Sequence, residues 1–449
     1  MAGLDPAIHV VLPNFPLNIS TKRRRVDGRV KPTAVRFVFL EAAHDIDSTR
    51  IQSFATHQDT KGINAVRHIN SVFHDVLKLV PWARFDALVG QYGTDDLVRK
   101  FTTRHQFKAL LFGQLGGGSS LRAIGEAMAS HGGRLYHCGA RAPKRSTFAD
   151  ANRLRDARVF GDLFKAMLQT ASPGFRRKLG DAVRLIDATG LHLAGVGAEW
   201  ARFSTQVCGA KAHVVFDPDL GRPVYHAVSA ANLNDISAAK DMPIEAGATY
   251  VFDLGYYDFA WWAQLDAQGC RLVTRFKKNT PLADARALPL DPQAGVVSDR
   301  IGFLPARQAR NRTNPMCDAV REIVVTTETG KTLRILSNDL DAPAQELADL
   351  YKRRWQIELF FRTMKQTLKI ASFLGRSENA VRIQVAVALI AFLLLSRLRE
   401  LTKEKPGFLQ LARLVRANLM HRKDVTRLRR PPPPNPFDSR QLQFDWSCT

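Results

Sequence analysis

Four side chains between residues 343 and 368 fall on one side of a predicted helix. They are Tyr351, Arg354, Glu358 and Lys365, and at 100° per residue they lie within roughly 60° of arc. An apolar stripe lies beside them, formed by Leu350, Ile357, Phe361, Met364 and Leu368. Taken alone, a row of one acid with basic and phenolic neighbours is typical of a solvated helix face. It gains a chemical meaning only if other parts of the chain bring acids to it.

Two aspartates can do so, because each follows a short apolar run that reads as a strand. Asp187 follows residues 183–186, and Asp253 follows residues 249–252. A single aspartate at a strand end usually belongs to a turn, but two of them with Glu358 make three carboxylates. Oxygen-only ligands suit Mg²⁺ or Mn²⁺, and two such ions about 3.5–4 Å apart serve phosphoryl transfer.

We therefore predict that Asp187, Asp253 and Glu358 converge to within metal-bridging reach and act as catalytic and metal-binding residues. Tyr351, Arg354 and Lys365 would then hold nearby phosphates, since charged donors are the usual partners of phosphate oxygens.

The composition points to a polyanionic partner. The chain has 449 residues, a formal net charge of +23 and a pI of about 10.2. A large basic excess is the electrostatic signature of nucleic-acid binding, although a merely basic soluble protein would share it. The length suggests about two to three domains.

Several other classes are disfavoured by the sequence. Residues 1–16 lack the pattern of a signal peptide. The longest apolar run, residues 385–395, is too short for a bilayer, which needs about 20 residues, so we expect a buried core helix and no membrane partner. The five cysteines are scattered without CxxC spacing, which argues against a zinc site or a disulfide framework and fits a reducing cytoplasm.

The first 175 residues divide in two. Residues 1–60 carry the basic run Lys22 to Arg25 and no sustained periodicity, so we predict a disordered basic arm. Residues 61–175 read as a helical DNA-binding domain, with helices over 64–80 and 101–115. Gly116 to Gly118 then break the chain, and Ser119 or Ser120 can cap a third helix. This order fits a helix-turn-helix that presents Arg122 to DNA, or equally an ordinary helical hairpin.

Residues 176–375 have an α/β texture. After residues 183–186, strands are predicted over 212–216, 223–229, 249–252 and 271–276, with helices over 236–241 and 259–268. Three hairpin-connected strands followed by helix, strand, helix and strand match a ribonuclease-H-like sheet. Residues 277–335 read as a β-rich insertion, and one long helix is predicted from 343 to 368. Residues 376–449 form a C-terminal helical region with a Pro-rich tail at 431–434. The predicted fold class is thus a ribonuclease-H-like mixed sheet flanked by helices, with a β-rich insertion and an all-α N-terminal domain.

The motif residues resemble a known family. Tyr351, Arg354, Glu358 and Lys365 fit the Y-(2)-R-(3)-E-(6)-K pattern of the insertion-sequence-4 transposases. Asp187-Ala-Thr resembles that family's first aspartate motif, and Asp253-Leu-Gly-Tyr resembles its second, with Leu254 where arginine is more usual.

This resemblance implies a DNA transposase that binds the terminal inverted repeats of its element and target DNA, pairs as a homodimer on DNA, and cuts and joins DNA with Mg²⁺. In well-studied members a tryptophan of the insertion stacks on a flipped base, yet residues 277–335 hold Phe303 as their only aromatic. Trp355, on the motif helix, is expected to pack in the core.

The prediction is therefore a metal-dependent DDE-type transposase of the bacterial cytoplasm, associated with the nucleoid. Two alternatives stay open. One is a DNA nuclease or resolvase of the same fold, which would cut without joining. The other is a catalytically silent DNA-binding relic, which the presence of all three carboxylates disfavours.

Overall fold

The structure is a computed structural model. It describes residues 70–428 apart from 171–181, 194–197, 203–207, 291–294, 308–312, 328–329, 369–372 and 403. The predicted basic arm and the Pro-rich tail lie outside these residues. All of these described residues belong to one compact unit by their contacts.

The centre of the protein is a mixed sheet in the order β3-β2-β1-β4-β5-β9-β8-β7-β6. Strands β1, β2 and β3 are antiparallel neighbours, and β4 and β5 run parallel to β1. The order 3-2-1-4-5 is that of a ribonuclease-H-like core, which confirms the predicted topology. The strand bounds are β1 Val183–Leu193, β2 Cys208–Asp217, β3 Arg222–Ala230, β4 Thr249–Phe252 and β5 Arg271–Arg275.

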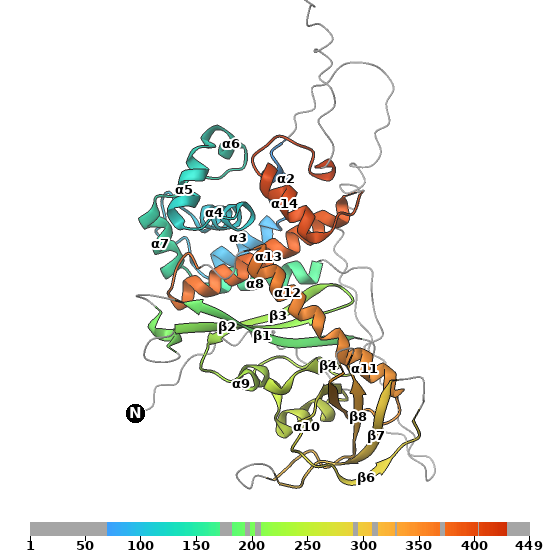
Figure 1. Ribbon diagram of the computed structural model, residues 1–449. Helices are drawn as coiled ribbons and strands as arrows, with labels where there is room; N and C mark the ends of the chain where they lie inside the picture. Colours follow the sequence, from blue (N-terminus) through green and yellow to red (C-terminus); the bar gives the residue numbers. More distant parts are fainter. Residues whose placement is uncertain are drawn as a thin grey trace, which may run out of the picture. The chain divides into compact units, whose positions relative to one another are not determined.

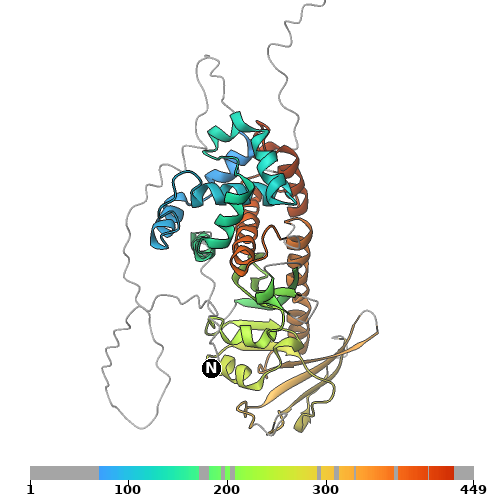
Figure 2. The same cartoon turned by 90° about the vertical axis from the view of Figure 1, so that its left-hand side faces the viewer.

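The β-rich insertion extends this sheet, because β9 pairs antiparallel with β5. Its strands are β6 Ala283–Ala287, β7 Val296–Phe303, β8 Val320–Thr326 and β9 Thr332–Ser337. Figure 2 shows them at the end of the sheet remote from the N-terminal helices. Two buried acids of this extension are paired: Asp299 with Arg321 at 2.7 Å, and Glu322 with Arg300 at 2.5 Å and with Arg334.

Side-chain alternation along the central strands separates two cores. Leu185, Val251 and Val273 belong to the core that includes α11, α12 and α13. Their neighbours Ile186 and Leu272 belong to the opposite core, under α9 and α10. This period of two is what a sheet covered on both faces requires. The helices concerned are α9 Asp235–Lys240, α10 Phe259–Ala267, α11 Ala344–Arg353, α12 Trp355–Gln366 and α13 Glu378–Leu401.

The N-terminal part is all helical, as predicted. The helices are α2 Val72–Lys78, α3 Trp82–Gln91, α4 Thr103–Gly116, α5 Leu121–Ala129, α6 Gly132–His137, α7 Arg145–Leu154 and α8 Arg158–Thr170. The glycine turn ends α4 with Gly117 in the left-handed region at φ 76°. Ser120, and not Ser119, caps α5 by accepting a hydrogen bond of 3.0 Å from the backbone N–H of Ala123.

Helix α13 corrects the expectation drawn from the run 385–395. The helix has 24 residues, so its length and composition would allow it to cross a membrane. In this fold it is a core helix, because 83% of its most apolar window is buried inside the protein. It contacts α4, α7, α8 and β3, and so lies between the N-terminal helices and the sheet (Figure 1). The prediction of a buried core helix is confirmed, and the helix extends beyond the apolar run at both ends.

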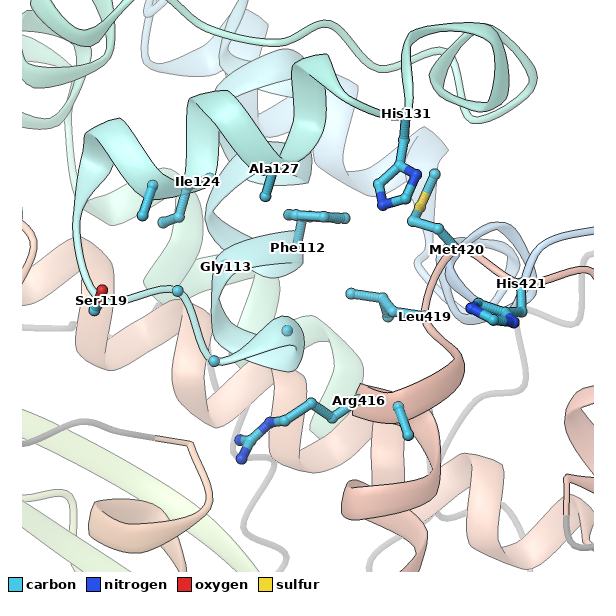
Figure 3. Close-up of a pocket in the computed structure, with 15 residues that line it drawn as sticks. Phe112, Gly113, Ser119, Ile124, Ala127, His131, Arg416, Leu419, Met420 and His421 are labelled. Carbon is cyan, nitrogen blue, oxygen red and sulfur yellow. The ribbon is translucent and has the colours of Figure 1, made fainter.

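The two ends of the described chain meet in the helical part. Helix α14, Phe408–Asn418, is followed by residues that bond to the start of α2. The backbone N–H groups of Val72 and Phe73 donate to the carbonyls of His421 and Leu419, at 3.1 and 2.8 Å. A cavity of about 360 Å³ lies between α4, α5 and the end of α14 (Figure 3). Hydrogen bonds thus connect the residues that follow α14 to the start of α2, and α4, α5 and the end of α14 line one cavity.

Candidate active site at the carboxyl ends of β1, β4 and β5

The parallel register of β1 and β4 brings the two aspartates side by side. Leu185 pairs with Val251, and extending that register by two residues places Asp187 beside Asp253. Both share the side-chain parity of Leu185 and Val251, so both face α11 and α12. Strand β1 was predicted to end at Asp187. It instead continues to Leu193, paired with β2. The pairing with β4 ends earlier, at Leu185 and Val251.

Asp253 is held by the turn that follows it. Its backbone is still extended, at φ −99° and ψ −170°, and its carboxylate accepts a hydrogen bond of 2.8 Å from the N–H of Gly255. A Cβ on Gly255 would lie 3.0 Å from Asp253 Oδ1 and 3.2 Å from Asp235 Oδ2. This explains why glycine follows the aspartate at this spacing.

Asp235 is a further carboxylate of this neighbourhood that sequence reasoning missed. It pairs with Lys211 at 2.9 Å and lies against the same turn as Asp253. In the sequence it looks only like an acid at the first turn of α9, where it complements the helix dipole. Only the fold brings that turn beside Asp253.

The motif helix is divided at Arg354. The predicted single helix over 343–368 is two helices, α11 and α12, and Arg354 is the junction between them. Its N–H bonds the carbonyl of Tyr351 and its carbonyl accepts from Ile357, both at 3.1 Å and both three residues apart. This tightened turn is 3₁₀-like. Arg354 keeps right-handed helical angles, φ −52° and ψ −30°, so the two helices follow one path (Figure 1).

Arg354 lies between two of the predicted metal ligands. Its guanidinium donates a hydrogen bond of 2.5 Å to Glu358 and lies 3.7 Å from Asp187. Among the described residues no three acidic, histidine or cysteine side chains form a metal-binding group. The expected convergence of all three carboxylates is therefore not seen among the described residues, and Arg354 instead contacts both Asp187 and Glu358.

Electrostatics nevertheless tie the three acids together. The pKa of Asp187 is raised to about 6, mainly by burial and in part by the negative charges of Asp253 and Glu358. The N–H of Ala188, at 2.8 Å, and the charge of Arg354 act in the opposite direction. A buried carboxyl surrounded by acids is costly to ionise, so a cation at this position would be stabilised. The oxygen-only donors fit Mg²⁺ or Mn²⁺ in kind.

Tyr351 belongs to the same neighbourhood, whereas Lys365 lies further along the helix. Burial raises the pKa of Tyr351, the charge of Asp253 adds to the rise, and the charges of Arg354 and Arg275 lower it. Lys365 is half-buried and seven residues past Glu358, on the same face but about 10 Å further along the helix. It would reach a phosphate next to the site rather than the carboxylates.

Trp355 corrects another expectation. It is 51% exposed beside Arg354, with the Arg362 guanidinium 5.7 Å from its ring, and it is not a core residue. The apolar face of α12 is instead formed by Ile357, Phe360, Phe361 and Met364. An exposed tryptophan next to the site is available for stacking on a base.

The helical part contains Arg122, the residue predicted to face DNA. Arg122 lies in the first turn of α5 and is exposed, as the helix-turn-helix hypothesis requires. Ile124 packs so closely on the preceding turn that a Cβ at Gly113 or Gly118 would lie 2.3 or 2.5 Å from it. The glycines are thus needed for the tight approach of α4 and α5. Whether α5 enters a groove stays a prediction.

Comparisons with known proteins agree with this geometry. Residues 178–394 match the family described as "Transposase DDE domain", and residues 68–141 match a "Domain of unknown function (DUF4372)". The chain is 37% identical over 299 residues to "Putative transposase y4zB" of Sinorhizobium fredii, which covers 67% of this chain and 84% of that protein. It is 27% identical over 225 residues to "Probable transposase for insertion sequence element IS5377" of Geobacillus stearothermophilus, covering 50% and 58%.

A structural likeness is found to the piggyBac transposase in a synaptic complex with hairpin DNA. The TM-score is 0.42 at 12% identity, over 83% of this chain and 84% of that one. On the sequence relatives, together with the ribonuclease-H-like strand order, this chain belongs to the DDE transposases of insertion sequences.

Proposed function

We propose that this transposase binds the terminal inverted repeats of its element, cuts DNA at their ends and joins them to target DNA. Two observations carry the proposal: the register of β1 and β4, whose extension places Asp187 beside Asp253, and the contacts of Arg354 with Asp187 and Glu358. Three acids from two parallel strands and a crossing helix suit phosphoryl transfer on a polyanion.

Asp187, Asp253 and Glu358 are proposed to hold two Mg²⁺ or Mn²⁺ ions. Ions bound there would activate the attacking water or 3′-hydroxyl and stabilise the leaving oxygen. Arg354 would give up its contacts with Asp187 and Glu358 and turn to a DNA phosphate, for which its planar fork of donors is suited. Tyr351 would place its hydroxyl beside the same phosphate, and Lys365 would bind the next one along the strand.

The helices between residues 70 and 170 are proposed to bind the element ends, with Arg122 on α5 facing the DNA. We also propose domain limits at 61–175, 176–375 and 376–449. The working form is a homodimer on DNA, in the bacterial cytoplasm, with no membrane partner. A net charge of +23 supports binding to long DNA of both element and target.

The test is cleavage by the purified full chain. With Mg²⁺ and a duplex carrying the repeat that flanks its own gene, the protein should nick at the element boundary, and Asp253→Ala should abolish nicking. Unchanged cleavage by Asp253→Ala would remove the site assignment. A plasmid target separates the alternatives, because a transposase yields a joined product, a nuclease yields only cut ends, and a silent relic yields bound but uncut DNA.

A further inference from the structure

The strand register places a third side chain, that of Arg275, next to the two aspartates. In the parallel pairing of β4 with β5, Val251 pairs with Val273 and Phe252 with Thr274. Extending the register by one residue places Arg275 beside Asp253. On its other side Arg275 pairs with Ile335, which belongs to the core under α11. Arg275 therefore has the same parity as Asp187 and Asp253 and faces the same side of the sheet.

Arg275 is exposed and uncommitted. Within the described part of the chain its guanidinium has no hydrogen bond or ion pair, whereas Arg354 is bound to Glu358. The charge of Arg275 lowers the pKa of Tyr351, which places it within electrostatic reach of that phenol. Since Arg354 already balances the acids, a second arginine at this edge is left free for another anion.

The loop that follows Arg275 is basic and firmly held. Lys277 and Lys278 are exposed, and their backbone carbonyls accept hydrogen bonds of 2.6 and 2.8 Å from Arg334. Arg334 is itself fixed on Glu322, a fully buried acid of the insertion. The Lys277 ammonium lies 4.2 Å from the centre of the Tyr257 ring, four residues after Asp253. The insertion thus braces a basic edge next to the candidate site.

We propose that Arg275 binds a DNA backbone phosphate adjacent to the scissile one, and that Lys277 and Lys278 continue this contact along the same strand. Arginine offers a forked pair of donors to phosphate oxygens, and its position beside Asp253 puts that fork at the rim of the site. The DNA strand then crosses the carboxyl end of β5 as it leaves the carboxylates. This inference rests on the proposed function.

The experiment compares Arg275→Gln, Arg275→Lys and a matched surface control, Arg397→Gln, in the full-length protein. Arg397 is 58% exposed on α13 and lies outside the site. Binding to a precut duplex bearing the terminal repeat is measured over a salt series without divalent ions. Cleavage is measured separately with Mg²⁺.

We expect Arg275→Gln to reduce the slope of log affinity against log salt by about one, as for one lost phosphate contact. Cleavage should fall about tenfold or more, with an unchanged melting temperature because the side chain is exposed. Arg275→Lys should restore the salt slope, since it retains the charge, and Arg397→Gln should match the wild type.

A wild-type salt slope in Arg275→Gln overturns the inference, and so does an equal loss of slope in Arg397→Gln. A lost slope that Arg275→Lys does not restore also overturns it, because it shows a structural role. If the wild-type protein binds but does not cut, the proposed function fails, while the salt slopes still decide the role of Arg275.

Discussion

The Arg354 guanidinium is bound to Glu358 at 2.5 Å, at the one residue that divides α11 from α12. It is also 3.7 Å from Asp187, so a single arginine spans two acids from different elements. Arginine cannot lose its proton under ordinary conditions, so its charge is permanently available to these carboxylates. Any cation that binds them must compete with it.

The first prediction concerns this competition. Arg354→Gln should leave Asp187 and Glu358 without their counter-charge, so the pKa of Asp187 should rise above its value of about 6. DNA cleavage with Mg²⁺ should fall about a hundredfold or more, because a charged group acting on the reacting phosphate is lost. The matched control is Arg353→Gln, at the neighbouring position, which removes an ion pair with Asp219. Equal losses in both variants would mean that helix stability, and not the site, is affected.

The second prediction is a pH dependence of stability. The folded-state pKa of Asp187, about 6, exceeds its ordinary value of 3.8. Between these values the unfolded chain has lost the proton while the folded chain keeps it, so stability falls as pH rises and stays lower above pH 6. The full cost is of the order of 3 kcal/mol.

Asp187→Asn removes this ionisation. At pH 7 without metal the variant should unfold at a higher temperature than the wild type, and the difference should vanish near pH 4. Added Mg²⁺ should raise the melting temperature of the wild type and not that of the variant. A constant difference at all pH values would show that Asp187 is not buried among acids as described.

The third prediction concerns Gly255. A methyl group there would lie 3.0 Å from Asp253 Oδ1 and 3.2 Å from Asp235 Oδ2. Gly255→Ala should displace the Asp253 carboxylate and reduce cleavage, with little change in the free energy of unfolding because the turn is partly exposed. Gly190→Ala, on the neighbouring strand β1, is the control, since its Cβ meets nothing within 4 Å. Full activity in Gly255→Ala would show that the position of Asp253 is not critical.

The fourth prediction tests the tight approach of α4 and α5. A Cβ at Gly113 would lie 2.3 Å from the Ile124 Cδ1, so Gly113→Ala should destabilise the fold by about 1–3 kcal/mol. Adding Ile124→Ala should relieve the clash, so the double variant should lose less than the sum of the single losses. Gly133→Ala, with open space around it, should not destabilise the fold. Denaturant unfolding gives the four values, and strict additivity would contradict the packing described.

The fifth prediction concerns Trp355. Because this side chain is half exposed, Trp355→Ala should change the free energy of unfolding by less than about 1 kcal/mol. If the indole stacks on a base, cleavage should fall while Trp355→Phe keeps most of it, since phenylalanine retains an aromatic face. A large stability loss in Trp355→Ala would instead restore the packing role predicted from sequence.

Much of the sheet was predictable because its strands are short apolar runs between turn residues. The strand order followed from the sequence of elements, and the capping of α5 from one serine after a glycine turn. The extent of β1 was mispredicted, because beyond Asp187 only every second residue is buried and the apolar run is lost. The break in the motif helix left no sequence signal either, since Arg354 stays in a helical conformation.

The neighbours of the site were harder to predict than its motif. Asp235 and Arg275 come from separate elements, and only strand register and the turn after β4 bring them near Asp253. Trp355 was assigned to the core on its size, but the helix turns it outward while smaller side chains pack beneath. Residue type and spacing identified the candidate site on one helix, whereas long-range pairing determines what surrounds it.

The hydrogen bonds from Val72 and Phe73 to His421 and Leu419 also bear on how the protein is made. The first described helix of the chain finds these partners only after nearly the whole polypeptide has been synthesised. A product of incomplete translation, or of a frameshift within the last helices, would contain the residues proposed to bind the element ends. It would lack the hydrogen bonds that join the start of α2 to the residues after α14. Premature termination would therefore be expected to produce fragments that compete poorly for DNA ends.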